Sequence, residues 1–272
     1  MKGRLLLMSL LALAACRGSR QAPAGDDSGA GPDSFVPSGI SGTDIAGRAL
    51  NVFAGHDRQS PDSFAPGTFV PASLLSVCDT AAFFSAAPVD SAVFARMSGR
   101  SYKEGCPVAV EDLRYLRVLH KDLDGRTLVG EMVCNKSIAD DLLEIFRALY
   151  DAGYPIERMR LIDDYDADDE ASMAANNSSC FNFRRKSGMS AVSKHAYGEA
   201  VDINPLYNPY YRVTAAGGRI VEPAAAAPYV DRSADFPYKI ERGDLCHRLF
   251  LEHGFHWGGS WTRSKDYQHF ER

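Results

Sequence analysis

The sequence predicts an α+β fold, and three patterns along the chain support this class. Short strand-like and helix-like segments alternate without the regular strand–helix–strand repeat of parallel α/β proteins. Two segments with alternating apolar and polar residues, 112–120 and 127–134, flank an Asp124-Gly125 pair that is typical of a hairpin turn. The segment 138–152 repeats apolar residues at helical spacing. A hairpin and separate helices together indicate an α+β domain.

Residues 1–16 have the pattern of a bacterial lipoprotein signal peptide. Lys2 and Arg4 precede an apolar run, 5–15, that is too short to span a bilayer as a mature helix. The run ends in Leu-Ala-Ala-Cys, which resembles a lipobox, and Cys16 would then be the lipidated first residue of the mature chain. A plain secretory signal with an incidental cysteine is the alternative. Because Arg17 rather than Asp follows Cys16, we expect a lipid-anchored envelope protein on the extracytoplasmic side, periplasmic or at the outer membrane, with no signal for inner-membrane retention.

Residues 17–70 are expected to be a flexible tether ahead of a folded domain at 71–272. The first part, 17–42, is mostly Gly, Ser, Pro, Asp and Ala, which bury too little apolar surface to fold. The second part, from residue 43, scatters Phe and Val among Gly and Pro, and it either extends the tether or wraps the domain. The net charge of -5 and the lack of a basic run give no reason to expect nucleic acid as a partner. We expect a monomer.

Within the domain, 89–97 has a weak helical period, and it is followed by the hairpin described above. Ser137 is placed to cap the helix over 138–152, and Asp140 and Asp141 occupy the first turn, where the helix dipole favours acidic residues. One apolar face of this helix should be core, formed by Ile138, Leu142, Ile145, Phe146 and Leu149. The segment 158–165 alternates as a strand would.

The second half of the domain has weaker signals. The acidic cluster 164–170 is expected to be a solvated loop, because it lacks the alternating ligand spacing of a calcium-binding loop. A short strand is expected at 200–203, and a Pro- and Ala-rich loop at 207–237. A helix follows near 244–253, ended by Gly254, and Gly258 and Gly259 allow close approach of the backbone.

Two short segments contain residue types suited to a metal site. The first, 193–205, has His195 and Asp202 seven positions apart, and the second, 266–271, has His269. Two imidazoles and one carboxylate suit Zn²⁺, which needs only three protein ligands when it is catalytic. Asp266 is the candidate general base and Glu271 the runner-up. Strand alternation would put Asp266 and His269 on opposite faces, so the segment must turn between them if Asp266 is the base.

The same segments resemble a known family. The pattern of Ser193, His195, Gly198, Ala200 and Asp202 is similar to that of the D-Ala-D-Ala metallopeptidases, which include VanY-type carboxypeptidases and L-alanyl-D-glutamate endopeptidases. The ending, from Trp257 to His269-Phe270, and the upstream run 176–184 are similar to the endopeptidase branch. The resemblance covers roughly 89–272. The candidate base is Asp where the carboxypeptidase branch has Glu, which affects the expected substrate.

This resemblance implies a small antiparallel sheet that carries the zinc and is flanked by helices, as in hedgehog and D,D-peptidase domains. It implies that His195, Asp202 and His269 bind Zn²⁺. Arg184 would bind a substrate carboxylate or assist the oxyanion, although a structural ion pair and a role for Arg185 instead are alternatives. Ser193 would bind substrate or cap its turn.

The implied function is hydrolysis of peptidoglycan stem peptides by metal-activated water, as an endopeptidase of the L-alanyl-D-glutamate type or a D-alanyl-D-alanine carboxypeptidase. Two alternatives remain open at this point. One is a catalytically silent, lipid-anchored wall-binding lipoprotein of the same fold. The other is a metal-binding scaffold lipoprotein that does not hydrolyse peptides.

Five cysteines remain beyond the signal segment: Cys78, Cys106, Cys134, Cys180 and Cys246. An odd number leaves at least one thiol free or paired with another molecule. Cys78 and Cys106 are the best guess for a disulfide, because both lie outside the metal segments. None of the spacings is that of a zinc ribbon, so the cysteines are not expected to be ligands.

Overall fold

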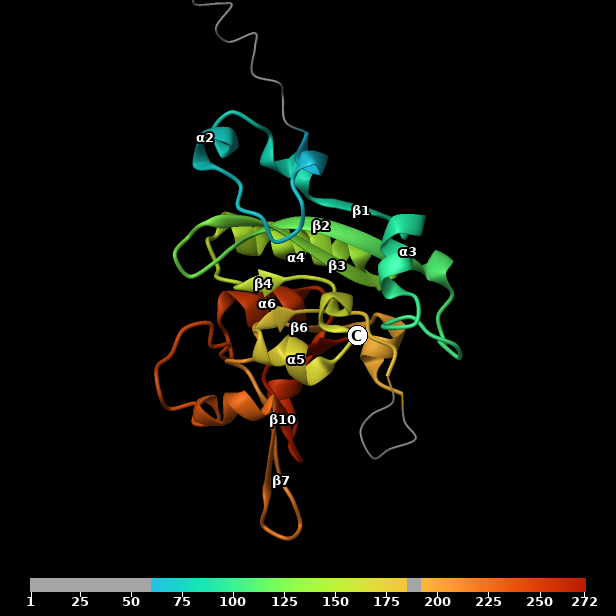
Figure 1. Ribbon diagram of the computed structural model, residues 1–272. Coiled ribbons are helices and arrows are strands. Elements are labelled where there is room, and N and C mark those ends of the chain that lie inside the picture. Colours follow the sequence, from blue (N-terminus) through green and yellow to red (C-terminus); the bar gives the residue numbers. More distant parts are fainter. Residues whose placement is uncertain (1–59, 185–191) are drawn as a thin grey trace, which may run out of the picture. The chain divides into compact units, whose positions relative to one another are not determined.

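The computed structural model describes residues 60–184 and 192–272, which belong to one compact unit (Figure 1). The expected signal peptide, the lipidation site Cys16, the tether up to residue 59 and Arg185 lie outside the described residues. Within the described ranges, no helix combines the length and apolar character needed to cross a membrane.

The largest sheet confirms the predicted hairpin. It contains β1 (Ser85–Pro88), β2 (Leu113–Lys121) and β3 (Thr127–Asn135) in the antiparallel order β1-β2-β3, and the β2–β3 register closes at Lys121 and Thr127. The segment before β1 adds to this hairpin: the amide of Val70 donates to the carbonyl of Thr127 at 2.9 Å. Residues 60–70, within the expected tether, therefore already contact the folded domain. Short helical turns precede β1 at Pro61–Ser63, Ala72–Leu75 (α2) and Thr80–Phe83.

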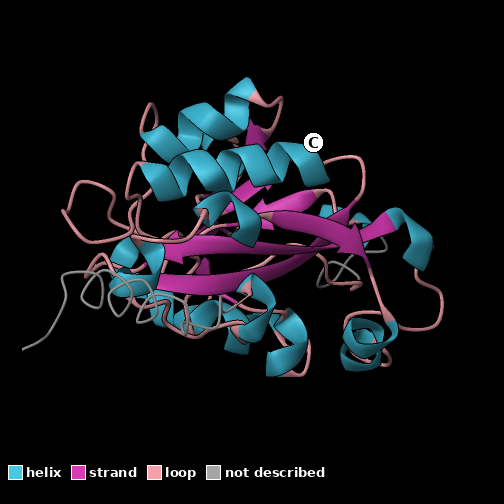
Figure 2. Ribbon diagram, turned by 90° about the horizontal axis from the view of Figure 1, so that it is seen from above, coloured by secondary structure: helices cyan, strands magenta, loops and turns pink. Residues whose placement is uncertain are grey.

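The central helix α4 (Ala139–Asp151) lies along one face of this sheet, as Figure 2 shows from above. All five apolar residues predicted for its core face are buried, and both acidic residues predicted for its first turn are there. The predicted Ser137 cap is wrong, because the cap position is Ile138 and no side chain caps the helix. Ser137 instead donates its amide to Asn135 Oδ1 at 3.0 Å in the preceding turn, so the helix starts one residue later.

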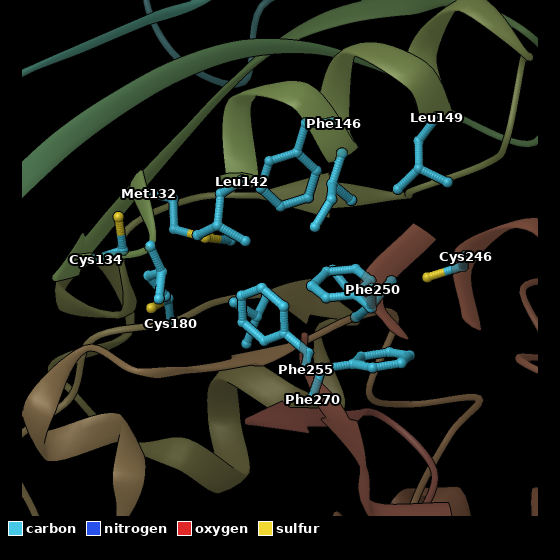
Figure 3. Close-up of a cluster of buried hydrophobic side chains, with 14 of the residues drawn as sticks. Met132, Cys134, Leu142, Phe146, Leu149, Cys180, Cys246, Phe250, Phe255 and Phe270 are labelled. Carbon is cyan, nitrogen blue, oxygen red and sulfur yellow. The ribbon is translucent and has the colours of Figure 1, made fainter. Parts of the chain in front are cut away.

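The main core lies between α4 and the C-terminal part of the domain (Figure 3). Phe146 and Leu149 of α4 face Phe250 of α6 (Leu245–Glu252) and Phe270. The rings of Phe250 and Phe270 stack with centroids 4.2 Å apart. The predicted helix near 244–253 is confirmed as α6, and Asp244 caps it by accepting from the His247 amide at 2.7 Å. Because Phe270 neighbours His269, this packing fixes the segment that carries a predicted ligand.

The strand predicted over 158–165 is mostly wrong. Only Arg158–Met159 (β4) is extended, pairing with Asn177–Ser178 (β5), and Ile162–Tyr165 forms a 3₁₀ turn. Side-chain bonds hold the chain in this turn. Arg160 Nε lies 3.1 Å from the fully buried carboxylate of Glu131, which Arg96 of α3 (Ser91–Met97) also binds. Asp163 accepts from the Ser101 amide at 3.0 Å.

Two predicted loops contain regular structure. The acidic cluster ends in a helix, α5 (Asp169–Ala174), because the side chain of Asp168 accepts from the Ala171 amide and caps it. The expected loop 207–237 contains a hairpin, β7 (Tyr210–Val213) and β8 (Arg219–Glu222), followed by a 3₁₀ helix, Ala224–Tyr229. The hairpin joins β10 (Lys265–Asp266) in a sheet of order β10-β7-β8.

A small antiparallel sheet carries two of the three ligand candidates, Asp202 and His269. Its order is β6-β11-β9, formed by β6 (Ala200–Asp202), β11 (His269–Glu271) and β9 (His256–Trp257). Three short 3₁₀ helices complete the described elements: Val110–Asp112, Lys194–Tyr197 and Gly258–Ser260. The predicted α+β class is confirmed.

The predicted disulfide is wrong. All five cysteines in the described part of the chain are free. Cys78 packs beside the core cluster of Val70 and Phe83, whereas Cys106 packs beside that of Val93 and Met97. The two cysteines belong to different parts of the core, so they do not meet.

Candidate metal centre

The fold brings His195, Asp202 and His269 together in one buried group. Asp202 and His269 face each other across β6 and β11 in direct register. His195 is in the 3₁₀ helix Lys194–Tyr197, immediately before β6. The three residues are 5%, 9% and 5% exposed, and their ligand atoms lie within 4.8 Å of one another. This is the only such group of metal-binding side chains in the described residues.

Distances within the group fit a single small cation. His195 Nε2 lies 3.2 Å from both His269 Nδ1 and Asp202 Oδ2, and His269 Nδ1 lies 3.1 Å from Asp202 Oδ1. Ligands at the usual Zn²⁺ bond lengths are separated by about 3.3 Å along the edge of a tetrahedron. The donor atoms are therefore spaced as neighbours in one tetrahedral shell would be.

The electrostatics of the group also favour a cation. Burial disfavours the charged form of Asp202, but the neighbouring imidazoles outweigh it and hold the pKa of this carboxyl well below its usual range. Burial lowers the pKa of His269, yet its bonds to the Asp202 and Glu271 carboxylates prevail and raise it to about 10. Surroundings that hold a proton on His269 this strongly are anionic, and they would stabilise a divalent cation in place of that proton.

Each histidine is oriented by a hydrogen bond from its other ring nitrogen. His195 Nδ1 lies 2.6 Å from the carbonyl oxygen of Cys180, and His269 Nε2 lies 3.1 Å from Glu271 Oε2. Such partners fix the ring and its tautomer, so that His195 Nε2 and His269 Nδ1 are presented to the metal position. Glu271, the runner-up base, is thus placed as the orienting partner of His269.

Two glycines permit the close approach of the chain around the group. Gly198 has φ 68°, and a Cβ there would lie 2.6 Å from the backbone nitrogen of Asn135. It ends the turn that carries His195 before β6 begins. At Gly258 a Cβ would lie 2.8 Å from the Cβ of Asp266 and 3.3 Å from that of His269. Larger residues at either position would displace the site.

Asp266 lies beside the group with one oxygen unsatisfied. Its Oδ1 is buried and has no hydrogen-bond partner among the described residues. Burial is the main cause that raises the pKa of this carboxyl to about 7, and Asp202 adds to it, while His269 and His195 favour the charged form. Residues 267 and 268 form a bend between β10 and β11, which is the turn the sequence required. A carboxylate with an unpaired oxygen and a near-neutral pKa is suited to accept a proton.

The other predicted site residues have structural partners. Arg184 forms an ion pair with Asp169 of α5, and its segment is tied to the site because the Asn182 amide donates to the His195 carbonyl at 3.1 Å. The Ser193 hydroxyl caps the turn by accepting from the His195 amide at 3.4 Å. The substrate-binding roles of Arg184 and Ser193 remain predictions.

Sequence reasoning missed two supporting groups. The carbonyl of Cys180 acts through the backbone, so residue type carries no signal for it. The role of Glu271 had a signal: on a strand, residues two apart share a face, and Glu271 follows His269 by two. Trp261 has its ring centroid 5.4 Å from that of His269 and borders the site.

The fold and the site define an α+β protein with a buried His–Asp–His group and an adjacent carboxylate with an unsatisfied oxygen, an arrangement suited to metal-assisted hydrolysis. Residues 187–272 match a family model described as D-alanyl-D-alanine carboxypeptidase. The match covers under half of the chain, but it includes the three ligand candidates and Asp266. Comparison with curated proteins and with solved structures finds no match. The family match supports a peptidase similar to these carboxypeptidases.

Proposed function

We propose that this protein is a zinc peptidase that hydrolyses the stem peptides of peptidoglycan, as an endopeptidase of the L-alanyl-D-glutamate type or as a D-alanyl-D-alanine carboxypeptidase. One observation carries the proposal: three buried donors at tetrahedral spacing lie beside a carboxylate with one unsatisfied oxygen, all inside the region similar to a carboxypeptidase family. A catalytically silent relative would be expected to have lost a ligand, whereas all three ligand candidates are present in this chain.

His195, Asp202 and His269 would hold the zinc, and the metal would supply the Lewis acidity that makes water nucleophilic and polarises the scissile carbonyl at neutral pH. Asp266 would accept the proton of the attacking water and deliver it to the leaving amine. Glu271 and the Cys180 carbonyl would keep the two imidazoles oriented. Trp261 beside His269 would limit access of bulk water on that side.

Digestion of purified muropeptides, with the products identified by mass spectrometry, tests the proposal and separates its two forms. Release of D-alanine identifies the carboxypeptidase, and products cut between L-alanine and D-glutamate identify the endopeptidase. Zinc-loaded protein that binds muropeptides but leaves every peptide bond intact would contradict the proposal and favour a wall-binding role.

Arg184 gives a prediction that separates substrate binding from a structural role. Arg184→Ala should keep its zinc but lose about 2–4 kcal/mol of transition-state stabilisation, the scale of a lost electrostatic donor. Arg184→Lys should recover little, because a point charge does not replace the planar fork. Steady-state kcat/KM measures the loss, and Asp169→Asn is the matched control because it breaks the ion pair while retaining Arg184. An equal loss of kcat/KM in Asp169→Asn would show that Arg184 acts through its structural ion pair and not through the substrate.

We also propose that the chain is anchored to a membrane through a lipid on Cys16 and meets its substrate in the cell envelope. The support is the basic, apolar and Leu-Ala-Ala-Cys pattern of 1–16. Growth with a labelled fatty acid should label the wild type and leave Cys16→Ser unlabelled. Equal labelling of both, or of neither, would contradict the anchor.

A further inference from the structure

The hairpin β7–β8 is joined directly to the strand that carries the candidate base. In the sheet β10-β7-β8, Asp266 pairs with Tyr210. Tyr267, which follows Asp266, donates its amide at 3.3 Å to the carbonyl of Pro209, which precedes Tyr210. Figure 1 shows β7 beginning beside β10 and continuing to the hairpin tip. Residues paired directly across antiparallel strands project from the same face, with Cβ atoms about 4.5–5.5 Å apart. Tyr210 and Asp266 are therefore side-by-side neighbours on one face.

That face is the one turned toward the metal group. The Cβ atoms of Asp266 and His269 flank the same point of the chain, since a Cβ at Gly258 would contact both. The charge on Asp266 also interacts with His269, Asp202 and His195. Tyr210, on the same face, consequently borders the position where a scissile bond would lie.

The opposite face packs against the rest of the domain. Tyr211 alternates with Tyr210 and pairs with Lys265, so it projects from the face of Lys265 and, by alternation, of Tyr267. The ring of Tyr267 in turn contacts Trp257, at 6.1 Å between centroids, and lies under the Arg232 guanidinium at 4.5 Å. The two adjacent tyrosines therefore project from opposite faces of the strand: Tyr211 from the face of Tyr267 and Tyr210 from the face of Asp266.

Tyr210 has no structural task in the described residues. Its side chain is half-buried, its hydroxyl makes no hydrogen bond, and its ring makes no aromatic or cation contact among residues 60–184 and 192–272. A tyrosine offers a flat apolar ring for packing and a hydroxyl that both donates and accepts, a combination suited to holding a peptide.

We propose that Tyr210 is a substrate-binding residue of this site, packing its ring on the peptide next to the scissile bond and hydrogen-bonding to it through the hydroxyl. The inference rests on the proposed function, because the ligand is the peptide substrate. It assigns part of the substrate pocket to the hairpin, outside the segments that hold the metal.

Matched variants of the two tyrosines test the proposal on a stem peptide that the wild type hydrolyses. Tyr210→Ala should raise KM by about tenfold or more, the worth of an apolar contact in a pocket. Tyr210→Phe should lower kcat/KM by about three- to tenfold, the worth of one hydrogen bond. Tyr211→Ala should leave KM within about twofold. All three variants should keep wild-type zinc content.

A binding measurement removes the dependence on turnover. In the Asp266→Asn background, which should cleave the bound peptide about 10²–10⁴-fold more slowly, calorimetry with the same stem peptide should give a weaker Kd for Tyr210→Ala by a similar factor. If Tyr210→Ala changes neither KM nor Kd, or if Tyr211→Ala changes them equally, the proposal is overturned. A kcat/KM for Tyr210→Phe equal to that of the wild type overturns the hydroxyl contact. If the wild type itself hydrolyses no stem peptide, the proposed function fails first.

Discussion

Single replacement of His195, Asp202 or His269 by Ala should remove the bound metal and abolish peptide hydrolysis. Each residue supplies one of three donors separated by 3.1–3.2 Å, so the loss of any one leaves too few ligands to hold zinc tightly. Elemental analysis of the purified variants should find less than stoichiometric zinc where the wild type holds one ion. Removing the metal from the wild type with a chelator should lower its melting temperature, because a cation that binds only the folded state stabilises it.

His253→Ala is a suitable control for this series. His253 bonds to Asp141 at 3.0 Å, away from the ligand group, so the substitution changes a histidine without touching the site. It should keep both zinc and activity. A His269→Ala protein with stoichiometric zinc and full activity would show that the ligand assignment is wrong.

That His195, Asp202 and His269 form one candidate metal group could be predicted from the sequence, because residue type and two short motifs indicate it. His195 lies in a 3₁₀ turn and Asp202 at the end of the short strand β6 that follows it. His269 lies in the strand β11. What spacing did not predict is the reason they converge, which is the direct pairing of Asp202 with His269 across two strands. Pairing between strands far apart in sequence depends on packing, here that of Phe270 on Phe250.

Elements with strong local patterns were predicted well, and the errors have local physical causes. The helix α4 and the hairpin β2–β3 follow from apolar periodicity and an Asp-Gly turn. The prediction of a strand over 158–165 failed because the side chains of Arg160 and Asp163 bond to residues distant in sequence, which a local pattern does not reveal. The hairpin β7–β8 was missed inside a Pro- and Ala-rich stretch, although Gly217-Gly218 between a segment of aromatic and β-branched residues and an Ile-Val pair is a turn signal. Because this hairpin was not predicted, Tyr210 was not identified as a candidate site residue.

Asp266→Asn should lower hydrolysis by about 10²–10⁴-fold, the usual worth of general acid–base catalysis, while zinc content stays near wild type. The amide keeps the shape of the carboxylate but does not accept a proton. Because Asp266 must be deprotonated to act, the wild-type rate should fall as the pH drops through the pKa of this group. Burial raises that pKa to about 7 in the metal-free fold, and a neighbouring cation favours the charged form, so the acidic limb should lie at or below pH 7.

The stability of the metal-free protein gives an independent readout of the same group. A carboxyl whose pKa is raised on folding, here from 3.8 to about 7, binds its proton more tightly in the folded state. Its ionisation therefore destabilises the fold progressively as the pH rises through this window. Metal-free Asp266→Asn lacks this contribution, so at pH 8 it should melt at or above the temperature of metal-free wild type. A clearly lower melting temperature would indicate a structural role for Asp266.

Glu271→Gln is the matched control for the base assignment. Glu271 accepts from His269 Nε2 at 3.1 Å, and a glutamine keeps an acceptor oxygen there, so the ring stays oriented and the rate should change far less than in Asp266→Asn. Parallel kcat/KM measurements across pH decide between the two carboxylates. If the large loss and the altered acidic limb belong to Glu271→Gln instead, Glu271 is the base. If both variants hydrolyse stem peptides at the wild-type rate, neither carboxylate moves the proton and the proposed mechanism is wrong.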